Sequence, residues 1–387
     1  MSNILVNGLK SKVGGGKIIF DTYLRLLAES EPDDTYFVLT PDRCSYASFE
    51  SDNIKIIDIP RWAHSNLATL PLYRFIMPNL LNNLGIDAIL NFGDIVIPTD
   101  VHQVYNFDWA FAVYPNHAIW GKLPLRDKVF FRLKLHFFEA YLRRAAVIMA
   151  QTQAMKSRLE ARYRLDNVVL VPAAVTVAEA SSSKKSVFDL PKGRFKFVYP
   201  ANYYPHKNID ILERVAAELK ARDVDVVIVL TIDPKEHEAA GRFLDRIKCG
   251  NLDDVLINVG RVSAEYIPAL YQACDALLMP TLLETFGLPY VEAMDHRKPI
   301  VTSDMDFAHA VCGEAALYCD PMDPLSILAA MERVWQDEEV RASLVTNGVR
   351  RLSAMWDWPR VFAEYQSLVM QGLAGRSPIG EQGVASS

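Results

Sequence analysis

Short β-branched runs alternate with longer amphipathic segments along nearly the whole chain. Such runs are typical of buried strands, and their separation by helix-length segments indicates βαβ units on parallel sheets. The first half holds the runs Ile4–Val6, Thr35–Leu39, Ile54–Ile57, Ala88–Asn91, Val101–Tyr105, Val147–Ala150 and Val168–Val171. The second half holds Phe195–Tyr199, Val224–Leu230, Val255–Val259, Ala276–Met279 and Pro299–Thr302. The pattern predicts an α/β protein with two parallel sheets.

The alternation is interrupted between residues 175 and 193, a segment rich in Ser, Lys and Pro. At about 150 residues per domain, 387 residues predict two to three domains. We therefore expect two Rossmann-like domains facing across a cleft, with ligands beyond the carboxyl ends of the strands. The expected bounds are 1–175 for the first domain, 176–193 for a linker, 194–356 for the second domain, 357–370 for a last helix and 371–387 for a flexible tail.

Composition and charge exclude several classes of protein. Half of the residues are hydrophobic, 23% are charged and the net charge is -6 at pH 7, which argues against a disordered chain and against a general nucleic-acid binder. The charge is uneven: residues 1–175 hold 19 Lys and Arg against 17 Asp and Glu (+2), and the remainder holds 22 against 30 (-8). The first part therefore favours anionic partners more than the whole chain does.

The cysteines and the N-terminal segment predict a cytoplasmic protein. The five cysteines are scattered and form no C-x-x-C pair, so neither a disulfide framework nor a zinc site is indicated. Met1 leads directly into a short apolar strand without the pattern of a signal peptide. No stretch reaches the roughly 18 apolar residues that a spanning helix needs.

The densest group of candidate site residues lies between Pro280 and Met294. A loop carrying Glu284 leads into a predicted helix that begins near Gly287 and has Pro289 in its first turn. The free N–H groups at such a start bind phosphate or pyrophosphate. Glu284 and Glu292 flank this anion site and would accept hydrogen bonds from sugar hydroxyls. The alternative is a capping acid and a surface acid on an ordinary helix.

A second candidate segment runs from Tyr199 to Asn208, directly after the first strand of the second half. It ends in His206 and Lys207, and the loop places the lysine at the carboxyl edge of the sheet. A cation at that edge would neutralise a leaving diphosphate. The alternative is a solvated lysine without a ligand.

Together the two segments resemble the retaining GT-B glycosyltransferases of the group 1 family, of the family 4 type. In that family a Lys-Asn follows the first strand of the second domain, and two glutamates with the spacing E-x7-E enclose F-G-L-P. Lys207-Asn208, Glu284 and Glu292 match this pattern, as does Phe286-Gly287-Leu288-Pro289. The similarity covers essentially all of the second half, and the first half matches more loosely, at residues 14–16 and 107–115.

The resemblance implies a GT-B fold with the donor on the second domain, the acceptor on the first, and the helix over 357–370 crossing back to the first domain. It implies a hexosyltransferase that uses a GDP- or UDP-linked sugar, with a mannose-type GDP-sugar preferred, and a glycan or lipid-linked glycan acceptor of a bacterial surface polysaccharide such as lipopolysaccharide. By this resemblance, Lys207 would bind the donor diphosphate, Glu284 the donor sugar and Glu292 the ribose, and Arg261 would lie beside the base. The amides of Phe286, Gly287 and Leu288 would bind phosphate and sugar. Gly15 and Gly16 would allow the first loop to approach the donor closely.

Three positions depart from the family pattern. The arginine usually found shortly before the lysine is missing; Ala201 and Asn202 occupy its neighbourhood, and we include Asn202 in the donor site. A frequent His-Asp pair reads Phe107-Asp108, and Asp108 is our candidate for orienting the acceptor, with a structural strand-end aspartate as the alternative. An acid common in the family is Ala310 here.

Retention without an evident enzymic nucleophile predicts front-face departure, with the leaving phosphate helping to deprotonate the acceptor hydroxyl. No metal or other cofactor is expected: Asp304-Met305-Asp306 mimics the D-x-D of metal-dependent transferases, but Lys207 and the helix dipole already serve the diphosphate. Two alternatives remain, a sugar phosphorylase or nucleotide-sugar epimerase on the same fold, and a non-catalytic nucleotide-sugar-binding subunit.

The segment 122–144 is the most basic part of the first domain, with seven Lys and Arg against two acids. Basic residues interleaved with Phe, Leu and Tyr suit a helix at an anionic membrane surface, where a lipid-linked acceptor would lie. The alternative, which we favour slightly, is a helix that buries its aromatic side chains against the sheet and leaves its charges solvated. The first hypothesis places the protein on the inner face of the cytoplasmic membrane as a peripheral protein.

Overall fold

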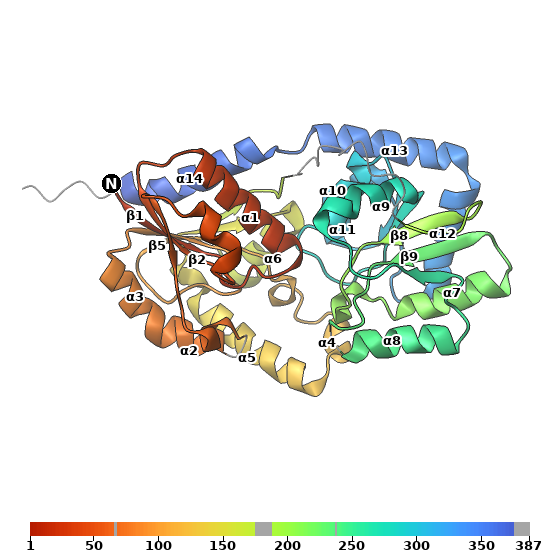
Figure 1. The fold of residues 1–387 in the computed structure, drawn as a ribbon, viewed down its shortest axis with the longest axis horizontal. Coiled ribbons are helices and arrows are strands. Elements are labelled where there is room, and N and C mark those ends of the chain that lie inside the picture. Colours follow the sequence, from red (N-terminus) through yellow and green to blue (C-terminus); the bar gives the residue numbers. More distant parts are fainter. Residues whose placement is uncertain (66–67, 175–187, 237, 375–387) are drawn as a thin grey trace, which may run out of the picture.

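The computed structural model describes residues 1–65, 68–174, 188–236 and 238–374. Two parallel sheets organise them, as the strand pattern predicted (Figure 1). The first sheet has the order β3-β2-β1-β4-β5-β6-β7. Its strands are β1 (Asn3–Asn7), β2 (Thr35–Leu39), β3 (Ile54–Ile57), β4 (Ala88–Asn91), β5 (His102–Asn106), β6 (Val147–Ala150) and β7 (Val168–Leu170).

The helices of the first domain lie between these strands along the chain. They are α1 (Gly14–Glu29), α2 (Thr69–Pro71), α3 (Met77–Leu84), α4 (Ile119–Lys122), α5 (Leu125–Tyr141) and α6 (Gln153–Tyr163). Of these, α1, α5 and α6 each connect two parallel neighbours. Short 3-10 turns extend several of them, among them η6 (Leu142–Arg144) after α5.

The second sheet has the order β10-β9-β8-β11-β12-β13. Its strands are β8 (Phe195–Tyr199), β9 (Val226–Leu230), β10 (Leu256–Asn258), β11 (Ala276–Met279), β12 (Ile300–Ser303) and β13 (Ala316–Cys319). Its helices are α7 (Ile211–Ala221), α8 (Glu238–Cys249), α9 (Ile267–Ala273), α10 (Leu288–Asp295), α11 (Asp306–Cys312), α12 (Pro324–Gln336) and α13 (Glu338–Ser353). The strand β13 was not among the predicted runs; it pairs with β12 at the edge of the sheet, and only its two end residues are buried.

The chain between the sheets includes the predicted linker 176–193. Residues 175–187 lie outside the described part of the chain, and residues 188–193 form neither helix nor strand. The strands of the first sheet end at Leu170 and those of the second begin at Phe195, so the linker prediction falls between the two sheets.

The last helix, α14 (Trp358–Ala374), returns to the first domain and packs on β4 and β5 (Figure 1). Its Tyr365 ring lies 5.9 Å from that of Tyr23 in α1, and the Leu368 carbonyl lies 3.0 Å from His102 Nε2. The helix extends past the predicted end at residue 370, so residues 371–374 are not part of a flexible tail. Gly372 lies against the His102 ring, and this packing continues the helix. Residues 375–387 of the predicted tail lie outside the described part.

Candidate functional site

Lys207 and Glu284 form an ion pair at the carboxyl edge of the second sheet. Lys207 ends the 3-10 turn η7 (Pro205–Lys207) after β8, and Glu284 lies in the loop after β11, the neighbour of β8. Lys207 Nζ donates to Glu284 Oε1 at 2.6 Å, and the side chains are only 17% and 11% exposed. Two residues 77 positions apart thus share one largely dehydrated site, where a charge acts more strongly than in bulk water.

Buried hydrogen bonds hold this pair in place. Asn208, which has a left-handed φ of 56°, donates to the carbonyl oxygens of Pro280 (3.1 Å) and Pro321 (2.7 Å). The Thr281 hydroxyl lies 3.0 Å from Glu284 Oε1, and the Tyr199 hydroxyl donates to the Lys207 carbonyl at 2.7 Å. The lysine and glutamate are therefore positioned by the backbone of both loops, as a preorganised anion site requires.

Helix α10 begins beside Glu284, as predicted for residues 287–289. Gly287 is its N-cap with a φ of 86°, and an added Cβ would lie 2.7 Å from the Tyr290 ring. Glycine is needed there for its left-handed backbone and for the packing of Tyr290, in addition to any approach of a ligand. No side chain caps this helix start. Pro289 has no N–H group and the Tyr290 N–H donates to the Gly287 carbonyl oxygen at 3.0 Å, so it is the Leu288 amide that stays available to an anion. Phe286, just before it, is 5% exposed.

Gly15 faces α10 from the first domain and Gly16 faces Asp108, but both glycines lie in the first turn of α1 and not in a loop as predicted. The helix begins at Gly14, whose φ of 65° favours glycine. A Cβ on Gly15 would lie 3.4 Å from Leu288 Cδ1, and one on Gly16 would lie 3.0 Å from Asp108 Oδ2. The starts of α1 and α10 thus come together between the domains.

Asp108 lies after β5 in the first domain, and its side chain contacts the second domain. Its Oδ1 accepts a hydrogen bond from Thr285 Oγ1 at 2.7 Å, and the residue remains solvent exposed. Although its surface is open to solvent, the side chain lies among many protein atoms between the domains. The resulting loss of bulk water, with the charges of Asp94 and Glu284, raises the pKa of Asp108 to about 6 against the opposing effects of Thr285 and Lys207. Such a carboxyl group can change protonation near neutral pH.

Glu292 lies one turn inside α10 and is separated from Glu284 by the predicted spacing. Its Oε2 lies 3.2 Å from the Tyr271 hydroxyl, which is also 3.1 Å from the Pro289 carbonyl oxygen. Burial raises the pKa of Glu292 to about 6, while the Tyr271 hydroxyl lowers it. Glu292 is therefore neither a simple capping acid nor a solvated surface acid.

The remaining predicted donor residues lie on loops of the second domain. Arg261 is exposed in the loop after β10, close enough for its charge to act on the Tyr204 hydroxyl. Asn202 is partly buried, and its carbonyl accepts a hydrogen bond from the Tyr204 amide at 3.0 Å. In the described part of the chain, no hydrogen bond or ion pair joins either residue to the Lys207–Glu284 pair.

Phe107, which stands where the family often has histidine, is fully buried, and the centre of its ring lies 6.0 Å from that of Phe138.

Two polar side chains near Phe107 were missed by the sequence analysis. Asn106 ends β5 and Gln151 follows β6, and both are buried. Their atoms Asn106 Oδ1 and Gln151 Nε2 have no hydrogen-bond partner among the described residues. Isolated amides carry no motif, so no sequence signal marked them.

The Asp304-Met305-Asp306 segment joins the domains. Asp306 Oδ1 accepts a hydrogen bond from Tyr114 at 2.5 Å, and Oδ2 accepts one from Arg158 Nε at 2.6 Å. Asp304 lies 2.6 Å from His309 Nε2. Within the described residues, no group of three or more His, Cys, Asp or Glu side chains could hold a metal ion. Asp306 thus serves as an inter-domain contact, a role that spacing alone did not indicate.

The basic segment 122–144 divides into α4, α5 and η6. Phe131 and Phe138 pack around Trp109, as the packing alternative predicted. The cations are partly neutralised: Lys134 is 9% exposed and pairs with Asp94 at 2.8 Å, and Arg144 pairs with Asp100. Lys122 donates to Asn208 Oδ1 at 2.8 Å across the domain boundary.

Comparison with known proteins decides the family. Residues 181–351 match the family described as glycosyl transferases group 1. This stretch contains Lys207, Glu284, α10 and Glu292, the residues that the structure gathers beside the second sheet. Residues 181–351 belong to the group 1 glycosyltransferases.

Relatives of this glycosyltransferase support the same assignment. The O-antigen chain mannosyltransferase RfbU of Salmonella typhimurium is 24% identical over 290 residues, which cover 74% of this chain and 78% of that protein. Alignments with three other relatives cover a smaller share of each relative's own length, namely 38%, 44% and 49%. The predicted enzyme class, a glycosyltransferase, is confirmed, and mannosyltransferases are among the relatives.

Solved structures establish the fold of the glycosyltransferase. The sucrose-phosphate synthase of Thermosynechococcus elongatus superposes with a TM-score of 0.74 at 18% identity, covering 97% of this chain and 100% of that one. HepE of Anabaena, in complex with UDP and glucose, superposes with a TM-score of 0.70 at 16% identity, covering 96% and 100%. The predicted GT-B fold is confirmed. No helix in the described part of the chain is both long and apolar enough to cross a membrane.

Proposed function

We propose that this glycosyltransferase moves a hexose, with retention of configuration, from a nucleotide-diphosphate sugar to a hydroxyl of a glycan or lipid-linked glycan in bacterial surface polysaccharide synthesis. The Lys207–Glu284 pair beside the uncapped start of α10 carries the proposal. A relative named as an O-antigen chain mannosyltransferase and a structural neighbour bound to UDP and glucose support it. The mannosyltransferase relatives favour a mannose-type donor, GDP- or UDP-linked.

In the proposed reaction the bond between the anomeric carbon and the diphosphate oxygen breaks. The acceptor oxygen bonds to the same face of the sugar, and its proton passes to the leaving phosphate. Lys207 and the Leu288 amide at the start of α10 stabilise the charge that develops on the diphosphate. Glu284 both holds Lys207 and accepts hydrogen bonds from the donor sugar, and Asp108 orients the acceptor hydroxyl from the first domain.

Two experiments in sequence test the identity of the donor and the roles of Lys207 and Glu284. Thermal-shift screening against GDP-, UDP- and dTDP-sugars identifies the donor, because a bound ligand stabilises the folded state by mass action. With that donor, Lys207→Ala and Glu284→Gln are each expected to abolish transfer. Lys220→Ala is the matched control, since Lys220 forms a pair of 2.8 Å with Asp254 on the exposed surface. Full activity of Lys207→Ala would overturn the proposed site.

The products separate this function from its alternatives. Nucleotide release that depends on an acceptor, with an α-linked product from an α-linked donor by NMR, supports retaining transfer. Release that needs inorganic phosphate in place of an acceptor would identify a phosphorylase, and conversion of the donor alone would identify an epimerase. Tight donor binding without turnover across acceptors would identify a non-catalytic subunit.

We also propose that transfer needs no metal ion. Both carboxylate oxygens of Asp306 already accept hydrogen bonds, from Tyr114 and Arg158. Lys207 and the start of α10 supply positive charge for the diphosphate. Turnover is expected to be unchanged in excess EDTA. Loss of turnover in EDTA and its recovery with Mg²⁺ or Mn²⁺ would contradict this.

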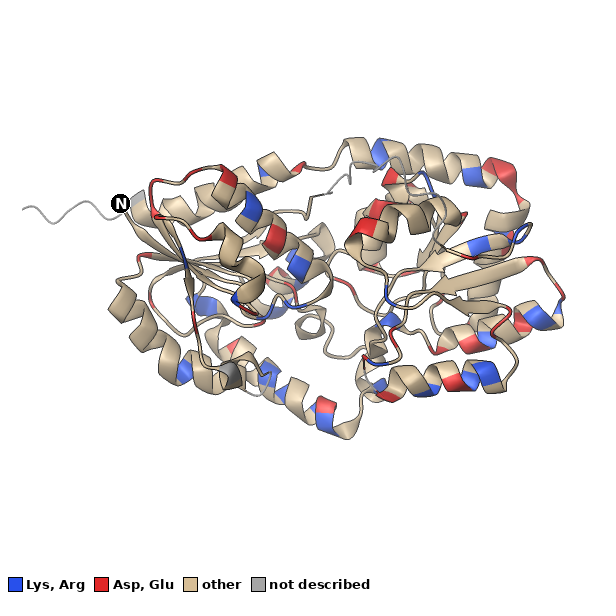
Figure 2. Cartoon of the chain, in the orientation of Figure 1, with Lys and Arg blue, Asp and Glu red and all other residues tan. Residues whose placement is uncertain are grey.

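We further propose that the protein is cytoplasmic and touches the inner face of the membrane through α5. Leu125, Val129 and Leu133 are 76%, 60% and 49% exposed and recur every four residues on one helix face. Lys and Arg residues lie along the same helix (Figure 2). An exposed apolar stripe with basic neighbours suits an anionic bilayer surface.

Sedimentation with phosphatidylglycerol vesicles tests this contact. The wild type is expected to sediment with them more than with phosphatidylcholine vesicles, and Leu125→Glu with Val129→Glu is expected to reduce this. Leu325→Glu is the control, since Leu325 is 53% exposed on α12 of the other domain. Equal sedimentation of wild type with both lipids would contradict the membrane proposal.

A further inference from the structure

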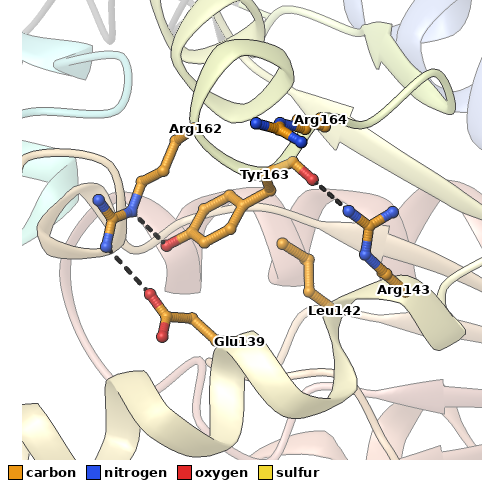
Figure 3. A pocket seen from close by; sticks show the side chains of 6 residues that line it. All are labelled: Glu139, Leu142, Arg143, Arg162, Tyr163 and Arg164. Carbon is orange, nitrogen blue, oxygen red and sulfur yellow. Dashed lines mark hydrogen bonds and ion pairs between the residues drawn. The ribbon is translucent and has the colours of Figure 1, made fainter.

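A basic pocket lies on the first domain, apart from the Lys207–Glu284 site. It has a volume of about 420 Å³ and is lined by Glu139, Leu142, Arg143, Arg162, Tyr163 and Arg164 (Figure 3). Glu139 belongs to α5 and Arg143 to η6, whereas Arg162 and Tyr163 end α6. The volume falls within the roughly 300–1,000 Å³ of small-ligand pockets.

The pocket carries surplus positive charge. Its lining has three guanidinium groups and one carboxylate, a formal charge of +2. The carboxylate is already used, because Arg162 Nη2 donates to Glu139 Oε1 at 3.0 Å. Arg143 donates one bond, to the Tyr163 carbonyl at 2.6 Å. Arg164 has no hydrogen bond or ion pair within the described residues. Most N–H groups of Arg143 and Arg164 are therefore free to bind an anion.

The surrounding bonds hold the pocket in shape. The Tyr163 hydroxyl donates to the Ala112 carbonyl at 2.6 Å and accepts from Arg162 Nε at 2.9 Å. The Arg162 guanidinium also lies 5.1 Å from the centre of the Tyr163 ring, and Leu142, the apolar residue of the lining, is 1% exposed. Arg162 and Arg143 are thus fixed on the two sides of Tyr163 before any ligand arrives (Figure 3).

Arg164 occupies a backbone position that usually belongs to glycine. It is the C-cap of α6 with a φ of 52° and a ψ of 55°, the left-handed conformation. That conformation costs a residue with a Cβ roughly 1–2 kcal/mol. The chain nevertheless places a guanidinium there, at the rim of the pocket, where a glycine would be the less strained choice.

We propose that Arg143, Arg162 and Arg164 form a phosphate-binding site. The planar forks of guanidinium groups match phosphate oxygens two at a time, which a lysine cluster would not do. The pocket volume exceeds that of a phosphate ion, so the ligand is a phosphate ester whose remaining part extends toward solvent. A soluble sugar phosphate and a lipid headgroup both present this chemistry.

The site is separate from the donor site. Helix α6 begins after Thr152, whose hydroxyl donates to the Thr285 carbonyl at the domain boundary (3.3 Å), and the pocket lies at the other end of the helix. Eleven residues at about 1.5 Å per residue place the pocket about 16 Å from that end. A phosphate ester bound there would leave the Lys207–Glu284 site open.

Thermal unfolding with inorganic phosphate and with glucose 6-phosphate tests the site in the full chain. The measurements use the Lys207→Ala background, so that phosphate bound at the donor site does not contribute. Both probes are expected to raise the melting temperature. Arg143→Gln with Arg164→Gly is expected to raise the dissociation constant by about tenfold or more, since each loses hydrogen bonds between charged groups. Arg164→Gly also relieves the left-handed strain, so a folding defect does not account for the loss.

Arg350→Gln serves as the control, because Arg350 forms an exposed pair with Glu314 on the second domain. This variant is expected to respond to phosphate as its parent does. An equal response in the parent and in the double variant would overturn the proposal, as would a response present in the wild type but absent in Lys207→Ala. Sedimentation with phosphatidylglycerol vesicles identifies the source: reduced binding of the double variant indicates a headgroup, whereas an effect confined to the soluble probes indicates a free phosphate ester.

Discussion

Thr285 Oγ1 donates a hydrogen bond of 2.7 Å to Asp108 Oδ1, and this bond connects the two domains beside the Lys207–Glu284 pair. Thr285 directly follows the glutamate of the donor site, whereas Asp108 lies two residues after the end of strand β5 of the other domain. A single bond thus links the donor loop to the candidate acceptor residue, and the charge of Asp108 responds to it.

Thr285→Val is expected to shift the pH dependence of transfer. The Thr285 hydroxyl lowers the pKa of Asp108, which lies at about 6, so its removal raises that pKa further. If ionised Asp108 orients the acceptor, the rise of kcat/KM with pH moves to higher pH in the variant. Thr346→Val, which removes an exposed hydroxyl on α13, is the control. An unchanged profile in Thr285→Val would remove Asp108 from the acceptor site.

Glu292→Gln is expected to change how stability depends on pH. The pKa of Glu292 is about 6 in the folded state and 4.5 in its ordinary range, so between these values the native state binds more protons than the unfolded state. The free energy of unfolding therefore falls as pH rises through this window, by about 2 kcal/mol for this group. The glutamine variant should gain stability relative to wild type between pH 4.5 and pH 7. Urea unfolding at both values measures this, and a constant difference would contradict it.

Asp306→Asn is expected to loosen the contact between the domains. Asp306 accepts bonds from Tyr114 and Arg158, and both groups of the Arg158 ion pair are partly exposed at 37% and 39%. Losing about 0.5–1 kcal/mol of this contact would raise the KM for the donor by about two- to fivefold. Small-angle scattering should show a larger radius of gyration. Asp304→Asn, the same change on the aspartate that pairs with His309, should leave both quantities unchanged.

Gly372→Ala is expected to destabilise the attachment of α14 to the first sheet. An added Cβ would lie 2.0 Å from His102 Cγ, on a ring that is held by the Leu368 carbonyl. Overpacking of this kind costs about 1–3 kcal/mol, which thermal unfolding detects as a lower melting temperature. Gly121→Ala is the control, since nothing lies within 4 Å of its added Cβ. Equal melting temperatures for the two variants would contradict the packing of α14.

Local pattern was sufficient for most of the fold. Every predicted strand is present, and those such as Thr35–Leu39 and Ala276–Met279 have the predicted bounds. A fully buried parallel strand needs an unbroken apolar run, which the sequence displays directly. The strand Ala316–Cys319 and the helical residues 371–374 were missed, since their place depends on pairing with β12 and on packing against His102, neither of which a local pattern shows.

The candidate site was predictable in its parts. Glu284, Gly287 and Glu292 lie in one segment, and Lys207 follows a strand whose carboxyl end had to meet the same edge of the sheet. The bonds that join these parts were not predictable. Thr285 and Asp108 are 177 positions apart, and no spacing rule pairs residues of two domains.

Short stretches of sequence are enough to predict the two parallel sheets, the loops that carry Lys207 and Glu284, and the start of α10, because strand periodicity and helix-start signals act locally. Tertiary packing, by contrast, makes Asp306 connect the domains, pairs Lys134 with Asp94 inside the first domain, and brings three arginines at the ends of η6 and α6 to one pocket. Charged and hydrogen-bonding groups pair with whatever lies near them in space, and that depends on how whole domains pack against each other.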